Sequence, residues 1–116
     1  MQRRLRLRRA EDFKRLREIG YTRRHPALML SYTANSLDSN RYGFITAKRL
    51  GHAVQRNRVR RLLREAVRAV HPHLATSYDI VFIARHGIVE QPLVEIQRIV
   101  VQLCDQAGLL SEEFQS

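Results

Sequence analysis

Six arginines lie within the eighteen-residue stretch GHAVQRNRVRRLLREAVR at 51–68, separated by small apolar residues at regular intervals. A guanidinium donates hydrogen bonds from a planar fork that matches two oxygens of a phosphate or a carboxylate. Several such groups at regular spacing could therefore bind a polyanion. Whether they do so depends on the element that carries them, because only an exposed face can reach a partner.

A helix over 56–70 would separate the two kinds of side chain. At about 100° per residue, the apolar residues fall on one face and the basic residues on the adjoining face. The apolar face would hold Val59, Leu62, Leu63, Ala66, Val67 and Val70. The basic stripe would hold Asn57, Arg60, Arg61, Arg64 and Arg68, with Arg56 and Arg58 flanking it at the amino end. We therefore expect this helix to pack by one face and to present arginines by another.

The alternative for such a helix is a solvated charged face. Solvated helices usually mix charges of both signs at i,i+4 spacing, whereas Glu65 is the single acid among these arginines. Like charges at this spacing repel one another, so they lower stability unless an anion compensates them. The choice of arginine over lysine also favours bidentate contacts to phosphate. The pattern therefore favours polyanion binding.

The whole chain agrees with a basic binding protein. Its 116 residues suffice for one domain, and a hydrophobic content of 44% argues against disorder. The net charge of +10 is uneven, with +7 in residues 1–24, +7 in 25–68 and −4 in 69–116. The partner-facing surface should therefore come from the first two thirds of the chain. Nucleic acid and acidic membranes are the polyanions that such a charge attracts.

Other classes of protein are disfavoured. Cys104 is the only cysteine, so an internal disulfide is excluded and a reducing, cytoplasmic compartment is expected. The longest strongly apolar run, IVFIA at 80–84, is far shorter than the roughly 20 residues that span a bilayer. The basic start lacks an apolar region, so no signal peptide is expected. Acids are scattered along the chain, so we predict neither a protein catalytic site nor a protein metal site, and His71-Pro-His73 should be a turn.

The elements should follow in the order helix, strands, helix, strand, helix. Residues 1–9 should form a flexible basic arm, and 108–116 a frayed tail. We expect helices over 11–19, 56–70 and 91–106, strands over 27–34, 41–48 and 78–85, and a turn or edge strand at 21–26. The last helix should bury Leu93, Val94, Ile96, Ile99, Val100, Leu103 and Ala107. This order predicts one domain over 1–116, an α/β (α+β) sandwich of one mixed sheet and its helices.

The residues alone leave DNA and RNA open. Membrane binding is weakly supported, because the arginine helix lacks an apolar half with Trp or Phe anchors.

A family resemblance adds more. The stretch AKRLGHAVQRNRVRRLLRE at 47–65 resembles the signature of the bacterial ribonuclease P protein subunit, K-K-x-G-x-A-V-x-R-N-x-x-K-R-x-x-R-E. Matching residues are Lys48, Gly51, Ala53, Val54, Arg56, Asn57, Arg61, Arg64 and Glu65, with Arg49 and Arg60 in place of lysines. Further matches are RL…DF at 4–13, Gly20, Arg41–Gly43 and DIVFIAR at 79–85.

The resemblance implies a fold and a function. The fold would be that of the second domain of a small-subunit ribosomal protein, with a left-handed strand–helix–strand crossover over 41–85. The function would be removal of the 5′ leader from precursor tRNA together with a catalytic RNA. That RNA would carry out the hydrolysis with bound Mg²⁺, and no membrane and no obligatory protein partner would be involved. The main rival is a ribosomal or rRNA-assembly protein, and a DNA-binding regulator is a third reading.

The resemblance also assigns residues. Those expected to bind the catalytic RNA are Arg56, Asn57, Arg60, Arg61 and Arg64, with Arg58 and Arg68 as additions. Those expected to bind the leader in a cleft beside the first helix are Phe13, Arg17, Tyr32, Lys48, Arg49 and Arg85. Without the resemblance, Phe13 would be assigned to the core, because it lies at helical spacing from Leu16. Arg17 stands where many relatives have phenylalanine, Ser31 where they have tyrosine, and His86 where lysine is common.

Overall fold

The computed structural model describes residues 5–7 and 9–111 of the chain. Its helices are α1 (Ala10–Ile19), α2 (Ala53–Val70) and α3 (Leu93–Gln106), and its strands are β1 (Tyr21–His25), β2 (Leu28–Ala34), β3 (Arg41–Ile45) and β4 (Tyr78–Ala84). Short 3-10 turns cover Lys48–Leu50, His71–His73 and His86–Ile88. No helix in this described part of the chain is long and apolar enough to cross a membrane. The predicted order of elements is confirmed.

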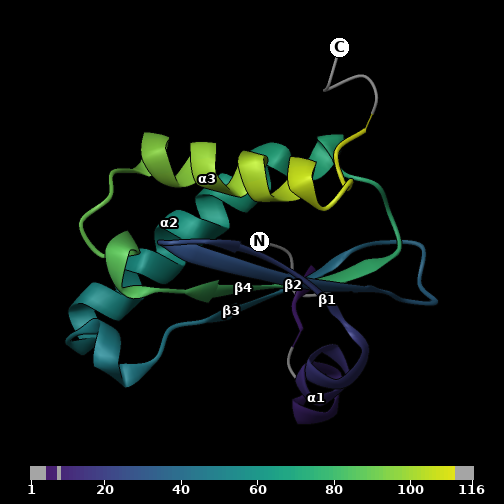
Figure 1. Cartoon of the computed structure of the whole chain (residues 1–116), viewed down its shortest axis with the longest axis horizontal. Helices are drawn as coiled ribbons and strands as arrows, with labels where there is room; N and C mark the ends of the chain where they lie inside the picture. Colours follow the sequence, from purple (N-terminus) through teal and green to yellow (C-terminus); the bar gives the residue numbers. More distant parts are fainter. Residues whose placement is uncertain (1–4, 8, 112–116) are drawn as a thin grey trace.

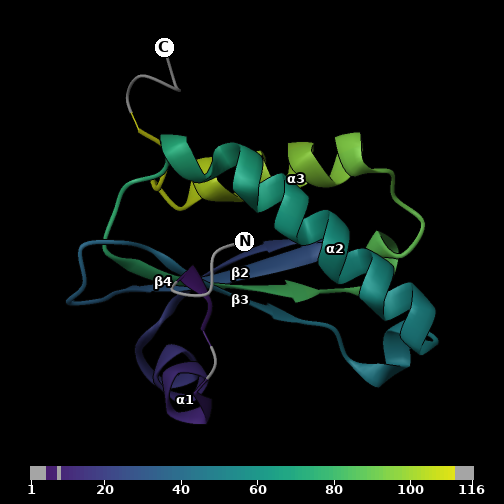
Figure 2. The ribbon, with the colours of Figure 1, turned by 180° about the vertical axis from the view of Figure 1, so that it is seen from behind.

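The four strands form one mixed sheet in the order β1-β2-β4-β3. The β1–β2 and β2–β4 pairs are antiparallel, whereas β3 and β4 are parallel and are joined through α2. Helices α2 and α3 cover one face of the sheet, and α1 lies against the other (Figures 1 and 2). The predicted α+β sandwich with a mixed sheet is therefore confirmed.

The main core lies between the sheet and the α2–α3 pair. Along β2, alternate residues face opposite sides, so Leu28, Leu30 and Tyr32 join this core. The predicted apolar face of α2 packs here, with Val59 and Leu63 fully buried. Of the apolar face predicted for α3, Ile96, Ile99, Val100 and Leu103 are buried. Leu93 and Ala107 are only partly buried, and the prediction was wrong for Val94, which is 72% exposed.

Two segments that were expected to be loose are packed. Leu5 and Leu7 are buried, and the Leu7 N–H donates to the Tyr42 carbonyl at 2.7 Å, so residues 5–7 lie along β3. At the other end, Leu109 and Leu110 are buried, and Leu110 pairs with Leu74. The predictions of a flexible arm and a frayed tail were therefore wrong for 5–7 and 108–111. Residues 1–4, 8 and 112–116 lie outside the described part.

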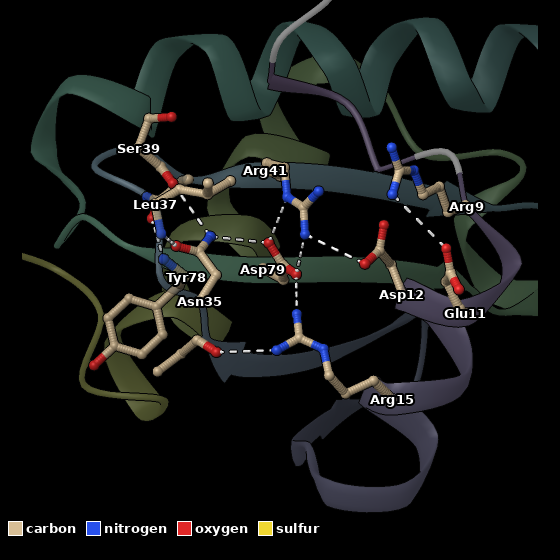
Figure 3. A network of polar contacts seen from close by, with 12 residues as sticks. Arg9, Glu11, Asp12, Arg15, Asn35, Leu37, Ser39, Arg41, Tyr78 and Asp79 are labelled. Carbon is tan, nitrogen blue, oxygen red and sulfur yellow. Dashed lines mark hydrogen bonds and ion pairs between the residues drawn. The ribbon is translucent and has the colours of Figure 1, made fainter.

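Helix α1 is attached to the sheet by a charged network centred on Asp79, whose side chain is fully buried in β4 (Figure 3). Arg41 on β3 donates from Nε at 2.9 Å and from Nη2 at 2.8 Å, and Asn35 Nδ2 donates at 2.9 Å. Arg15 on α1 donates to the second carboxylate oxygen. Burial raises the pKa of Asp79, but the hydrogen bonds from Arg41 and Asn35 and the charges of Arg41 and Arg15 outweigh it, so the pKa is lowered.

We expect Asp79→Asn to lower the free energy of unfolding by about 3 kcal/mol, because it leaves two arginines without their buried partner. The lowered folded-state pKa also predicts a pH dependence. The stability from Asp79 is present above the unfolded-state pKa of about 4 and is lost as the pH falls through the lower folded-state value. Urea unfolding at pH 7 and at acid pH measures both effects. The matched control is Asp38→Asn at an exposed turn residue. Equal stability of the two variants would contradict the prediction.

Candidate nucleic-acid interface

The start of α2 depends on a glycine of the arginine segment. The His52 N–H donates to Gln55 Oε1 at 2.8 Å, which satisfies one of the free amides at the helix start. Gly51 has φ of 145°, and a Cβ there would lie 2.0 Å from the same Gln55 oxygen. Glycine is therefore required where the chain turns from β3 into α2. This turn sets the rotation of the helix and hence the direction of its arginines.

Two arginines of the predicted stripe are held over β3 and the residue after it. Arg60 Nε donates to Thr46 Oγ1 at 2.9 Å, and the guanidinium of Arg64 lies 5.9 Å from the centre of the Phe44 ring. This is a cation–π contact, and Phe44 in turn stacks on Phe82 with 6.0 Å between ring centres. Burial, followed by the charges of Arg6 and Arg60, lowers the pKa of Arg64. The arginines are thus ordered side by side despite mutual repulsion.

The other predicted residues of α2 fall into two groups. Asn57 and Arg61 are exposed, and Arg56 is partly buried, with no partner for its Nε among the described residues. In contrast, Arg58 donates to the carbonyls of Val89 at 3.0 Å and Gln91 at 3.2 Å. Arg58 therefore fastens α2 to the segment before α3, a packing contact that the sequence pattern did not predict. Arg68 forms an exposed ion pair with Glu65 at 2.8 Å.

On the opposite face of the sheet, a cleft lies beside α1. One cavity of about 350 Å³ is lined by Phe13 and Arg17 of α1 and by residues of the sheet that include Ser31. A second cavity of about 410 Å³ is lined by Arg49, Arg85 and His86. The two cavities share Met29 and Ile83. Together they form a groove with an aromatic end and a basic end.

The groove contains most of the residues predicted for the leader. Phe13, Arg17, Arg49 and Arg85 line it, and Lys48 is an exposed neighbour of Arg49 that does not. Tyr32 is a correction, because it belongs to the opposite face of the sheet and is only 9% exposed in the main core. Adjacent strand residues point to opposite sides, so Ser31 occupies the groove and Tyr32 cannot.

The sequence resemblance included Gly43 but gave it no role. A Cβ on Gly43 would lie 2.8 Å and 2.9 Å from two carbons of the Phe13 ring. The glycine therefore lets this ring lie against the backbone of β3. A glycine inside a predicted strand indicates such a close approach, and this was the available signal.

Among the described residues, no group of three or more His, Cys, Asp or Glu side chains could hold a metal ion. The buried carboxylate of Asp79 on β4 is occupied by Arg15 and Arg41. His71 belongs to a polar contact with the Tyr42 hydroxyl at 2.6 Å, and burial raises the pKa of Tyr42 to about 12. The charged side chains that line the groove are Arg17, Arg49 and Arg85, all of them cationic.

The fold and this surface define a class of protein, a small basic α+β domain with an arginine-bearing helix on one face of its sheet and an open groove on the other. The family model described as Ribonuclease P matches residues 1–108. The "Ribonuclease P protein component" of Chloroflexus aggregans is 45% identical over 112 residues, which cover 96% of this chain and 83% of the relative. That of Roseiflexus sp. is 44% identical, over 95% of this chain and 91% of the relative.

Solved structures agree. The RNase P protein of Staphylococcus aureus superposes with a TM-score of 0.85 at 26% identity, covering 92% of this chain and 98% of that one. The chain therefore belongs to the ribonuclease P protein family. This membership gives it a role in tRNA processing as part of an endoribonuclease.

We expect Gly43→Ala to displace the Phe13 ring, because the new methyl group would overlap two ring carbons. Overpacking of this kind costs about 1–3 kcal/mol, and the low end is expected where a flexible side chain can move away. The measurement is the aromatic NMR signals of Phe13 together with urea unfolding. Gly87→Ala is the matched control, since its Cβ would meet nothing closer than 3.6 Å. Unchanged Phe13 signals in Gly43→Ala would show that the close approach is absent.

Proposed function

We propose that the chain binds the catalytic RNA of ribonuclease P through the arginines of α2 and holds the 5′ leader of precursor tRNA in the groove beside α1. Binding at both places would promote endonucleolytic removal of the leader. The observation that carries this proposal is the placement of the two surfaces on opposite faces of one sheet. A rigid sheet between them fixes their relative positions, which suits a protein that must align two RNA molecules.

The arginine surface suits contact with a structured RNA. Thr46 occupies only Nε of Arg60, so the terminal N–H groups of that guanidinium can still donate to a phosphate. The cation–π contact of Arg64 with Phe44 leaves its planar fork available as well. Each phosphate that is neutralised releases condensed counterions, so binding should weaken steeply with salt.

The groove suits a single strand of variable sequence. Phe13 offers an aromatic ring on which a base can stack, and such stacking contributes about 1–3 kcal/mol whatever the base. The planar guanidinium of Arg17 can stack on a base in the same way. Arg49 and Arg85 at the other end would pair with the phosphates.

In this proposal the RNA performs the hydrolysis and holds the Mg²⁺. A protein nuclease that uses two metal ions needs clustered carboxylates, whereas the acids of this sequence are scattered, with no more than two adjacent. The chain would then need only RNA partners, namely the catalytic RNA and precursor tRNA, without a membrane or an obligatory protein partner. Under this proposal the protein acts on precursor tRNA in the bacterial cytoplasm.

The double variant Arg60→Ala/Arg64→Ala should abolish stimulation of leader removal. The assay reconstitutes a transcribed bacterial ribonuclease P RNA with precursor tRNA at low Mg²⁺, with and without the protein. Loss of two phosphate contacts should weaken binding to the catalytic RNA. It should also reduce the slope of log K against log salt concentration by about 1.4–1.8. Arg98→Ala, at an exposed arginine of α3, is the matched control. Tight general RNA binding without stimulation by the wild type would instead favour a ribosome-assembly protein.

Phe13→Ala should weaken binding of precursor tRNA by the equivalent of about 1–3 kcal/mol, because a base loses its stacking partner. Binding of mature tRNA, which has no leader, and of the catalytic RNA should stay unchanged. The measurement is the affinity of the reconstituted complex for the two substrates. Phe13→Trp is the matched variant and should keep the affinity, since it retains an aromatic ring. An equal loss for both substrates would remove the groove from the proposal.

A further inference from the structure

The segment 5–7 adds to the open edge of the sheet. Arg6 forms a parallel bridge with Tyr42 of β3, and the Leu7 N–H donates to the Tyr42 carbonyl at 2.7 Å. Leu5 joins the main core on the α2 side, whereas Leu7 joins the small cluster of Leu16 and Val81 on the α1 side. The backbone of Arg6 is therefore fixed between two buried leucines, although its own side chain is exposed.

This segment brings a third arginine to the surface of α2. Arg6 is bridged to Tyr42, Arg64 lies over Phe44, and Arg60 donates to Thr46 just past the end of β3. The residues that the three arginines contact are Tyr42, Phe44 and Thr46. They alternate along one extended segment, so neighbouring contact points lie about 7 Å apart along the backbone. Three positive charges from two distant parts of the sequence thus follow one edge of the sheet.

The electrostatics of Arg64 agree with this arrangement. After burial, the largest effects on its pKa come from the charges of Arg6 and Arg60, and all of them lower it. Arg6 and Arg60 therefore each repel Arg64 in the free protein. Phosphates bound between these arginines would relieve the repulsion, and this relief would make binding of the phosphates more favourable.

We infer that Arg6 completes a phosphate-binding site with Arg60 and Arg64, which takes successive phosphodiesters of an RNA backbone at the β3 edge. The inference rests on the proposed function, because the ligand is the catalytic RNA. It adds a residue outside the arginine segment of α2, delivered by an N-terminal strand rather than by the helix. A phosphodiester chain fits this site better than a single anion, since three cations lie in a row.

The test compares Arg6→Ala with Arg9→Ala in the full chain. Arg9 is three residues away and exposed, and its ion pair with Glu11 is a surface contact at 3.8 Å, so it is a matched control for charge. Affinity for the transcribed catalytic RNA is measured over a range of salt concentrations. Arg6→Ala should weaken binding about tenfold and reduce the salt slope by about 0.7–0.9, whereas Arg9→Ala should leave both unchanged. Arg6→Lys should restore the slope, because it keeps the charge.

The outcomes separate the inference from the proposed function. If Arg60→Ala/Arg64→Ala weakens binding but Arg6→Ala behaves like Arg9→Ala, the inference is overturned and the proposed function stands. If the wild type has no preference for the catalytic RNA over other RNA, both fail. A double-mutant cycle of Arg6→Ala and Arg64→Ala adds a second readout. A shared site predicts that the two losses are not additive, whereas strict additivity would overturn the shared site.

Discussion

The position of α1 depends on one buried carboxylate. Leu16 is the one buried residue of this helix within the described part of the chain. Apolar contacts alone therefore hold α1 only weakly against the sheet. Asp79 supplies the missing attachment, because it binds Arg15 of α1 and Arg41 of β3 in the same network. The ionic contacts have fixed directions, unlike apolar packing. They therefore set both the distance and the rotation of α1, and with them the width of the groove that holds Phe13.

The sheet then separates two environments. Side chains of β2 and β3 alternate between a dense apolar core under α2 and α3 and a shallow groove beside α1. Gly43 belongs to the groove side, where its missing side chain makes room for Phe13. Tyr42 and Phe44, its neighbours on β3, belong to the other side and support Arg6 and Arg64. A single strand thus positions the aromatic end of the groove and the arginine surface together.

Arginine serves two purposes in this small protein. Arg15, Arg41 and Arg58 are used internally, where they neutralise Asp79 or satisfy backbone carbonyls. Arg60 and Arg64 are only partly engaged and keep donors for a partner. The distinction depends on whether a carboxylate or a free carbonyl lies within reach. Composition counts both groups alike, so the net charge overstates the number of arginines that a polyanion can meet.

The sequence alone determined the elements and the amphipathic design of α2, because helical periodicity is local and six arginines beside an apolar face leave few arrangements. It also placed Phe13, Arg17, Arg49 and Arg85 near one groove, through a resemblance that covers nearly the whole chain. It could not place Tyr32, because a shift of one residue along a strand reverses the face and no local pattern fixes that register. It also missed the packing of Leu5, Leu7, Leu109 and Leu110.

These misses share a physical reason. The leucines near both ends are buried by partners far away in sequence, such as Tyr42 and Leu74, which become neighbours only when the sheet has formed. The same holds for the contact of Arg58 with Val89 and for the role of Gly43. Periodicity and charge pattern thus decided which surfaces exist. Only the tertiary structure decided which side chains remain available on them, because burial and pairing are set by contacts across the fold.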